Sequence, residues 1–149
     1  MKIIVAGSRD CTDRNLIFDT ITEGIKELGK PSVIIAGGCR GVDKIAVEYA
    51  KEYGINYTEY PADWNDIKCE GANIKERVNP WTKKKEKYNS MAGFQRNEKM
   101  AIDGDALISI NIGNTPGTKN MVQLAKDYNL KIYEYCPQPL NAGDFDIDF

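Results

Sequence analysis

Histidine is absent from this sequence of 149 residues. It is the commonest general base at neutral pH and the commonest metal ligand of proteins. Its absence excludes serine–histidine and cysteine–histidine catalysis, and it removes the usual ligand of a metal site. Any chemistry would have to use carboxylates, lysine, tyrosine, hydroxyl groups or the substrate itself.

Cysteine and long apolar runs are also scarce. The four cysteines are scattered, with no Cys-x-x-Cys pair, so we expect free thiols in a reducing cytosol rather than disulfides or a zinc site. No apolar run is long enough to cross a membrane, and the opening run 1–6 is too short for a signal peptide. The sequence therefore predicts a cytoplasmic protein, in the host cytoplasm if a phage encodes it, with no membrane partner and no required metal or cofactor.

Neither sign of charge is in large excess. The formal net charge is −2 and the isoelectric point is about 5.3. This balance provides no overall attraction to a polyanion, which speaks against nucleic acid as a partner and requires any anion-binding site to be local. Hydrophobic residues at 42% and charged residues at 28% are ordinary values for one globular domain.

Short aliphatic runs alternate with segments of helical periodicity along the chain. The expected strands are residues 2–6, 32–36, 56–60, 106–110 and 131–135, and the expected helices are 13–28, 42–53, 93–102 and 118–128. Thr12 is the expected N-cap of the first helix and Thr118 that of the fourth. This alternation predicts a three-layer Rossmann-like α/β domain, with a mainly parallel five-stranded sheet and helices on both faces.

The chain divides into a main domain and two less regular segments. The nucleotide-binding domain is expected over residues 1–136. Within it, residues 64–92 show little periodicity and are expected to form an inserted loop or lid. Residues 137–149 are expected to form an acidic and aromatic C-terminal tail.

Three polar or glycine-rich loops follow the first, second and fourth expected strands. Ligands of open α/β sheets bind outside the carboxyl ends of the strands. Glycine lets a backbone approach a ligand closely, and the helix after each loop offers unpaired N–H groups to an anion. The candidate ligand-binding residues of these loops are Gly7, Ser8, Arg9, Asp10, Gly37, Gly38, Arg40, Gly41, Asp43, Gly117, Thr118 and Lys119.

Three of the five arginines lie in these loops or at the start of the third expected helix: Arg9, Arg40 and Arg96. A guanidinium group offers a planar fork to phosphate oxygens, so we expect the three to converge, with Asn97, on one anion. The alternative is that each pairs with a nearby carboxylate, for example Arg40 with Asp43. Asp43 could be a first-turn helix carboxylate, which the sequence favours, or it could accept a hydrogen bond from a ribose hydroxyl.

Five motifs resemble the YspA-like branch of the SLOG superfamily: Ala6-Gly7-Ser8-Arg9-Asp10, Gly37-Gly38-Cys39-Arg40-Gly41-Val42-Asp43, Pro61-Ala62-Asp63-Trp64, Arg96-Asn97-Glu98-Lys99-Met100 and Gly117-Thr118-Lys119. Proteins of this branch occur in bacteria and their phages. The resemblance implies a Rossmann-like fold that binds nucleotides or nucleotide-derived signals, and a homo-oligomer. The superfamily includes the lonely-guy phosphoribohydrolases, DNA-processing protein A and ligand sensors of antiphage defence systems.

The chain departs from the phosphoribohydrolases at one catalytic position. Their motif ends in a glutamate that serves catalysis, and Met121 stands at that position here. A thioether can neither stabilise an oxocarbenium ion nor move a proton. The resemblance therefore implies a phosphate-binding site without that catalytic group. Glu98 or Asp10 could take its place, and Glu98 is the weak catalytic candidate.

Other features have both a functional and a structural interpretation. Tyr60 and Trp64 are base-stacking candidates, although packing explains them equally well. The run 83–87, Lys-Lys-Lys-Glu-Lys, could attract an anionic ligand, and the sequence favours a solvated loop. The alternating residues 144–149 could bind a protein partner, and the sequence favours a disordered end.

The function expected from these observations is binding of a nucleotide or nucleotide-derived molecule, such as an NAD-derived or cyclic nucleotide signal. Such a protein would sequester or sense its ligand, and in a phage it would be a candidate anti-defence protein. The alternatives are a hydrolase that cleaves an N-glycosidic or phosphate bond of a nucleotide, and a single-stranded nucleic-acid-binding protein.

Overall fold

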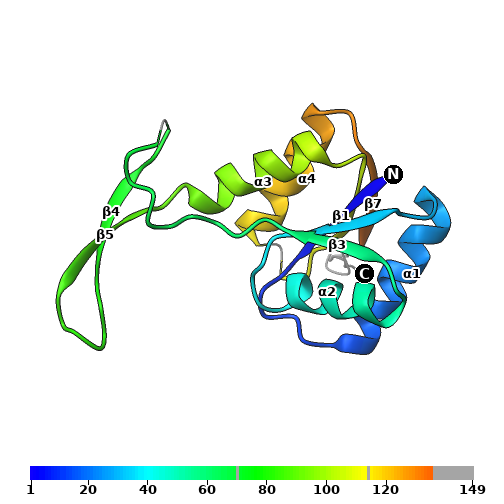
Figure 1. Cartoon of the computed structure of the whole chain (residues 1–149), viewed down its shortest axis with the longest axis horizontal. Helices are drawn as coiled ribbons and strands as arrows, with labels where there is room; N and C mark the ends of the chain where they lie inside the picture. Colours follow the sequence, from blue (N-terminus) through cyan, green and yellow to red (C-terminus); the bar gives the residue numbers. More distant parts are fainter. Residues whose placement is uncertain (70, 114, 136–149) are drawn as a thin grey trace, which may run out of the picture.

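The computed structural model describes residues 1–69, 71–113 and 115–135. Its main sheet has five parallel strands in the order β3-β2-β1-β6-β7 (Figure 1). These are β1 (Lys2–Gly7), β2 (Val33–Ala36), β3 (Asn56–Glu59), β6 (Ala106–Ile110) and β7 (Lys131–Tyr135). The predictions for the tail 137–149 lie outside the described residues.

Two helices cover each face of this sheet. Helices α1 (Arg14–Leu28) and α2 (Val42–Glu52) pack on one face, and α3 (Ala92–Asp103) and α4 (Pro116–Asp127) pack on the other. Successive residues of a strand point to opposite faces, so the aliphatic side chains of β1 alternate between the two layers of core. The predicted three-layer Rossmann-like fold is confirmed.

Two helix starts differ from the prediction. Helix α1 is capped by Asp13, whose side chain accepts a hydrogen bond from the N–H of Leu16 at 3.1 Å, and not by Thr12. Helix α4 begins at Pro116 with Thr115 as its N-cap, three residues before the expected Thr118. Proline suits this first helical position because its missing N–H would have no partner there.

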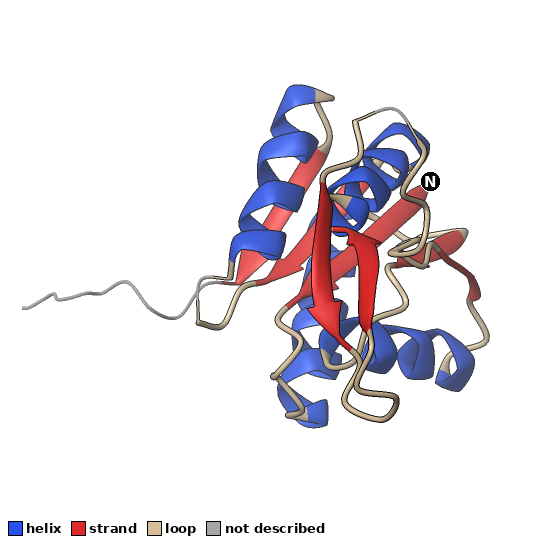
Figure 2. Cartoon of the chain, turned by 90° about the vertical axis from the view of Figure 1, so that its left-hand side faces the viewer, coloured by secondary structure: helices blue, strands red, loops and turns tan. Residues whose placement is uncertain are grey.

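The insertion 64–92, expected to be an inserted loop or lid, contains an antiparallel hairpin. Strands β4 (Ile74–Val78) and β5 (Lys85–Asn89) pair with each other, and the hairpin projects beyond α3, away from the main sheet (Figures 1 and 2). The turn is closed by Asn79, whose side chain accepts from the N–H groups of Trp81 and Thr82. Both faces of the hairpin carry exposed charged side chains, so it lacks the apolar alternation that identifies a strand in a sequence.

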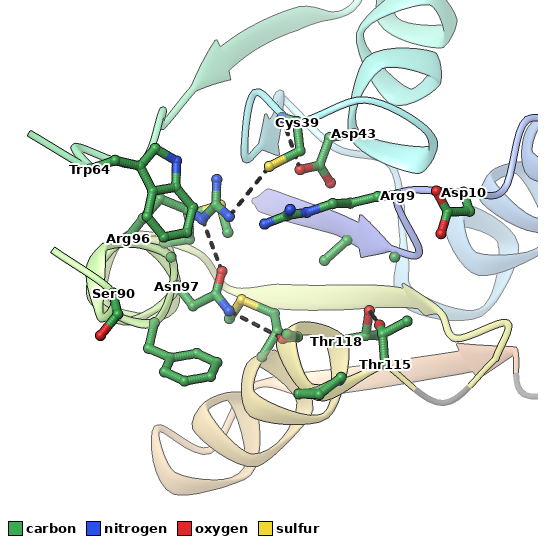
Figure 3. A pocket seen from close by; sticks show the side chains of 18 residues that line it. Arg9, Asp10, Cys39, Asp43, Trp64, Ser90, Arg96, Asn97, Thr115 and Thr118 are labelled. Carbon is green, nitrogen blue, oxygen red and sulfur yellow. Dashed lines mark hydrogen bonds between the residues drawn. The ribbon is translucent and has the colours of Figure 1, made fainter. Parts of the chain in front are cut away.

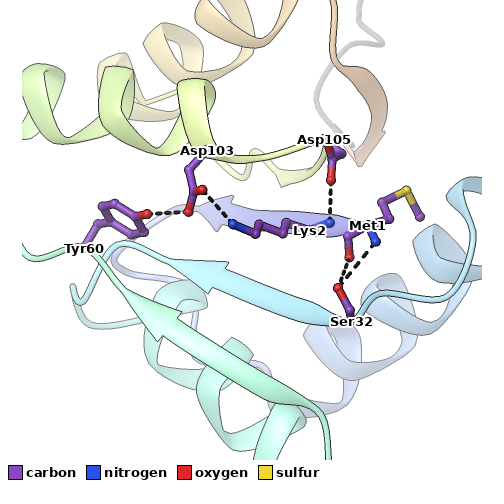
Figure 4. A network of polar contacts seen from close by, with 6 residues as sticks. All are labelled: Met1, Lys2, Ser32, Tyr60, Asp103 and Asp105. Carbon is purple, nitrogen blue, oxygen red and sulfur yellow. Dashed lines mark hydrogen bonds and ion pairs between the residues drawn. The ribbon is translucent and has the colours of Figure 1, made fainter.

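Polar side chains connect the end of α3 to β1 and to the segment after β3. Lys2 of β1 forms an ion pair with Asp103 at the end of α3, at 2.8 Å, and Tyr60 donates a hydrogen bond to the same carboxylate (Figure 4). The hydrogen bond from Lys2 lowers the pKa of Asp103, and the one from Tyr60 lowers it further. This network fixes the end of α3 beside β1 and the segment after β3.

Candidate functional site

The main sheet has its topological switch point between β1 and β6. From β1 the chain moves outward through β2 and β3, and it then returns to the other side of β1 to form β6 and β7. In open α/β sheets, such a point leaves a crevice at the carboxyl ends of the strands, where ligands bind. The loops after β1, β2 and β6 meet at this edge.

A cavity of about 310 Å³ occupies this position (Figure 3). Its walls come from the loops after β1 and β2, the segment before the hairpin, and the first turns of α3 and α4. The lining residues are Ala6, Gly7, Arg9, Asp10, Cys39, Asp43, Trp64, Ser90, Gly93, Phe94, Arg96, Asn97, Met100, Thr115, Pro116, Gly117, Thr118 and Met121.

Two helix N-termini face this cavity. Gly93 and Phe94 of α3 and Gly117 and Thr118 of α4 line it, and neither helix has a side chain that caps its first turn. The first N–H groups of a helix have no partner within the helix, and the helix dipole adds partial positive charge there. Two such ends on one hollow favour an anion, such as a phosphate group.

Arg9 supplies a full positive charge to the cavity. Its side chain extends from the loop after β1 into the cavity, between Asp43 and the start of α4 (Figure 3). No ion pair or hydrogen bond joins it to another residue in the described ranges. Its guanidinium group is therefore available to a ligand.

Arg96 lines the cavity but is largely occupied by the protein itself. Its guanidinium group donates to the carbonyl oxygens of Gly37 and Tyr60, the latter at 3.2 Å, and to the side chain of Asn97 at 3.0 Å. The contacts are with carbonyl oxygens rather than with a paired carboxylate. Arg96 thus connects α3 to the ends of β2 and β3, which the sequence could not indicate.

Asp43 is a buried carboxylate in the first turn of α2. It accepts a hydrogen bond from the N–H of Cys39 at 3.3 Å. Burial raises the pKa of Asp43, and the nearby guanidinium groups of Arg96 and Arg9 offset part of this rise. A cavity carboxylate with a raised pKa can accept from a ribose hydroxyl or exchange a proton with a ligand.

Arg40 does not line the cavity. It forms an exposed ion pair with Asp10 at 2.9 Å, so a carboxylate does pair with it, although not the expected Asp43. It lines a hollow of about 450 Å³ next to the cavity, with Arg9, Trp64, Arg77 and Tyr88. We call this the outer hollow; its sixth lining residue is Cys39.

Most of the glycines that were predicted to contact the ligand are packed against protein atoms instead. A Cβ on Gly37 would lie 2.6 Å from Arg96 Nη1, and one on Gly7 would lie 2.5 Å from the oxygen of Ile110. Gly41 adopts a positive φ of 76° and packs against the backbone of the loop after β1, and Gly38 faces Pro61. Only Gly117, among the predicted glycines, has open space where a Cβ would be.

Three other residues were predicted to bind the ligand. Two of them form hydrogen bonds within the protein, and the third lies outside the cavity lining. Ser8 is buried and exchanges hydrogen bonds with the backbone of Ile112, which joins the ends of β1 and β6. Asn97 donates to the carbonyl oxygen of Gly117 at 3.2 Å and so positions the start of α4. Lys119 is exposed and lies outside the cavity lining.

The two stacking candidates occupy different places. Trp64 lines both the cavity and the outer hollow, whereas Tyr60 lines neither and donates its hydroxyl to Asp103 (Figure 4). Phe94 also lines the cavity and is not among the residues predicted from the sequence. Its place in the first turn of α3, beside the predicted Arg96, is the signal that could have indicated it.

The weak catalytic candidate Glu98 is exposed and accepts a hydrogen bond from the hydroxyl of Tyr128 at 3.2 Å. It is not among the lining residues, whereas Met121 is. The carboxylates that line the cavity in the described ranges are Asp10 and Asp43. Any acid–base step in the cavity would depend on these groups or on the ligand.

The described residues, 1–69, 71–113 and 115–135, also bear on metal binding and on membrane insertion. No cluster of three cysteine, aspartate or glutamate side chains there is arranged to hold a metal ion. None of the helices described is long and apolar enough to cross a membrane.

Comparison with known proteins identifies related sequences. Residues 1–66 match the model of the YAcAr family, described as the YspA, cpYpsA-related SLOG family. A curated relative, the Gene 61 protein of Mycobacterium phage D29, is 25% identical over 144 residues, which cover 93% of this chain and 98% of the relative.

Solved structures show the same fold at low sequence identity. DNA processing protein A from Streptococcus pneumoniae superposes with a TM-score of 0.64 at 16% identity, over 94% of this chain and 52% of that one. The chain thus spans about half the length of that protein. The Helicobacter pylori counterpart gives 0.61 at 19% identity, over 95% and 67% of the two chains, and TM1055 gives 0.56 at 17% identity, over 88% and 71%.

The structure of the Helicobacter pylori protein concerns its single-stranded DNA binding mode. We expected nucleic acid to be an unlikely partner, and the proteins that share this fold do not bear out that expectation. The resemblance to the YspA-related SLOG family is confirmed: its sequence pattern covers residues 1–66, and the neighbouring structures share the fold over about nine-tenths of the chain.

Proposed function

We propose that this chain binds a nucleotide or nucleotide-derived small molecule in the cavity at the carboxyl edge of its sheet. The observation that carries this proposal is that Arg9, which has no ion-pair partner, converges on one hollow with two helix N-termini that have no side-chain cap hydrogen bond. Three sources of positive potential in a chain of net charge −2 favour an anionic ligand.

Each part of a nucleotide has a complementary group in the cavity. The amides at the start of α4 and the guanidinium group of Arg9 suit a phosphate group. The half-buried ring of Trp64 offers a face to a base. Asp43 suits a ribose hydroxyl, because an ionised carboxylate is an acceptor only.

The phage relative is consistent with a role in a phage or bacterial cell. In that setting, the proposed function is to sequester or sense a nucleotide-derived signal, such as an NAD-derived molecule or a cyclic nucleotide. The proposal includes that copies of this chain associate into a homo-oligomer.

Isothermal titration calorimetry with mononucleotides, cyclic nucleotides and ADP-ribose derivatives tests the proposal. We expect one of these classes to bind the wild type, and Arg9→Ala to weaken binding about ten- to a hundredfold, as for loss of a charged hydrogen bond. Arg14→Ala is the matched control, because Arg14 pairs with Glu48 and Glu52 outside the cavity. No heat with any of these classes would contradict the proposal.

Cleavage of an N-glycosidic bond is the second candidate function. The observation that favours it is the raised pKa of Asp43 in the cavity wall, because perturbed carboxylates cluster at catalytic sites. Chromatography after incubation with nucleoside monophosphates should then show free base, and Asp43→Asn should abolish it. Intact nucleotides throughout the incubation would exclude this candidate.

A further inference from the structure

Four of the five arginines line the cavity or the outer hollow: Arg9, Arg40, Arg77 and Arg96. The cavity and the outer hollow adjoin, because Arg9, Cys39 and Trp64 line both. A ligand in the cavity could therefore continue into the outer hollow without leaving positively charged surface.

The hairpin as a whole is basic, and Arg77 is its basic residue that lines the outer hollow. Residues 74–89 contain six basic and two acidic side chains, a net charge of +4, whereas the rest of the sequence contains fourteen basic and twenty acidic ones, a net charge of −6. The charge is therefore segregated onto the hairpin. A segment of this charge favours a ligand with several phosphate groups over one with a single phosphate.

Aromatic rings accompany these charges at the outer hollow. The guanidinium group of Arg77 lies 5.0 Å from the centre of the Tyr88 ring. Lys75 lies directly opposite Tyr88, and Arg77 directly opposite Glu86, in the hairpin, so these four side chains share one face, with two basic groups and one acidic group. Together with Trp64, this face provides both stacking surfaces and phosphate contacts, the combination that binds single-stranded nucleic acid.

The hairpin is held in place at its base. Asn89 is fully buried, and its side chain accepts from the N–H groups of Asn73 and Met91 at 3.2 and 3.0 Å and donates to Gln95 at 2.7 Å. Its N–H donates to the carbonyl oxygen of Trp64 at 2.7 Å. The outer hollow is therefore built before a ligand arrives.

We propose that the ligand is a phosphodiester-linked single strand of two or more nucleotides, with one nucleotide in the cavity and the next in the outer hollow. This inference rests on the proposed function, because the cavity holds the first nucleotide. A duplex fits less well, because its bases are already stacked and present no free faces to Trp64 and Tyr88.

Titration of nucleotides of increasing length tests this inference. The probes are a mononucleotide, the dinucleotide of the same base and a strand of roughly eight nucleotides, each measured by calorimetry at two salt concentrations. We expect the dinucleotide to bind about tenfold more tightly than the mononucleotide. A further gain with the longer strand identifies a polynucleotide as the source, and equal affinity identifies a free dinucleotide.

Arg77→Gln separates the outer hollow from the cavity. This variant should lose the tenfold gain while its mononucleotide affinity stays unchanged, and Arg14→Gln should behave as the wild type. For the longer strand, the slope of log affinity against log salt should fall by about 0.7, the value for one phosphate contact on a single strand. Unfolding curves of both variants show whether the fold is kept.

Three results would overturn the inference. If the mononucleotide binds but the dinucleotide and the longer strand gain nothing, the outer hollow has no role and only this inference fails. If Arg77→Gln retains the full gain, the hairpin is not the second contact. If vesicles of anionic lipid bind the hairpin and oligonucleotides do not, the basic face serves a membrane. Absence of binding by every nucleotide would instead contradict the proposed function itself.

Discussion

Arg96 of α3 donates a hydrogen bond to the carbonyl oxygen of Gly37 at the end of β2. The guanidinium group and the carboxylate of Asp43 both lie where a side chain at position 37 would be, 2.6 and 2.7 Å from a Cβ. One glycine thus leaves room for two ionisable groups from different helices over the end of a strand.

This packing predicts that Gly37→Ala displaces both groups. We expect a loss of about 1–3 kcal/mol in the free energy of unfolding, typical of overpacking at a buried position. Denaturant unfolding measures it. Gly117→Ala is the control, since nothing lies within 4 Å of a Cβ there. Equal stability of the two variants would show that Gly37 is not constrained.

Asp43 predicts a dependence of stability on pH. Burial raises its pKa, so the folded state holds this proton more tightly than the unfolded state. The stability from the protonated carboxyl is therefore full below the unfolded pKa of about 3.9 and is lost as the pH rises through the folded pKa. Asp43→Asn removes this loss.

We expect the stability of Asp43→Asn relative to the wild type to increase from pH 3.5 to pH 7, a range set around the unfolded pKa of about 3.9. Unfolding curves across this range measure the difference. A constant difference would mean that the pKa of Asp43 is the same in both states.

The fluorescence of Trp64 can be measured by itself, because the sequence has one other tryptophan, Trp81, and a single substitution removes it. In Trp81→Phe, the emission of Trp64 alone reports on the cavity, and stacking by a base should quench it. In Trp64→Phe, the remaining Trp81 is 89% exposed at the hairpin tip and should not respond to a mononucleotide. A quench in the second variant but not in the first would place the base elsewhere.

Asn89 predicts how firmly the hairpin is held. Asn89→Ala leaves its backbone and side-chain partners without their hydrogen bonds, at a cost of about 1–3 kcal/mol. Because the hairpin packs apart from the main core, we expect faster amide exchange within residues 74–89 and little change in the main sheet. Asn65→Ala, at an exposed position nearby, should leave exchange unchanged, and a uniform increase across the sheet would contradict this local role.

The five parallel strands and four helices were predictable, because continuous aliphatic runs and helical periodicity reflect burial in a three-layer fold. The hairpin was not, since charges occupy both faces of its exposed strands. The switch point indicated the edge that holds the cavity, and Arg9, Asp43, Trp64 and Gly117 lie there as expected.

The roles within the site were harder to predict. Glycine allows close approach by any atom, and at Gly7, Gly37 and Gly41 that atom belongs to the protein. An arginine can likewise bind a ligand, as proposed for Arg9, or the protein's own carbonyl oxygens, as Arg96 of α3 does. The position of a residue in the sequence does not show whether it contacts a ligand or another part of the protein.

Backbone amide chemical shifts during titration with a nucleotide that binds would locate the ligand directly. Binding in the cavity predicts that the largest changes occur at the start of α4, at Gly117 and Thr118, and at the start of α3, at Gly93 and Phe94, with smaller changes in α1. Changes confined to α1, the outer face of α2 or the amino edge of the sheet would contradict a nucleotide site at the switch point.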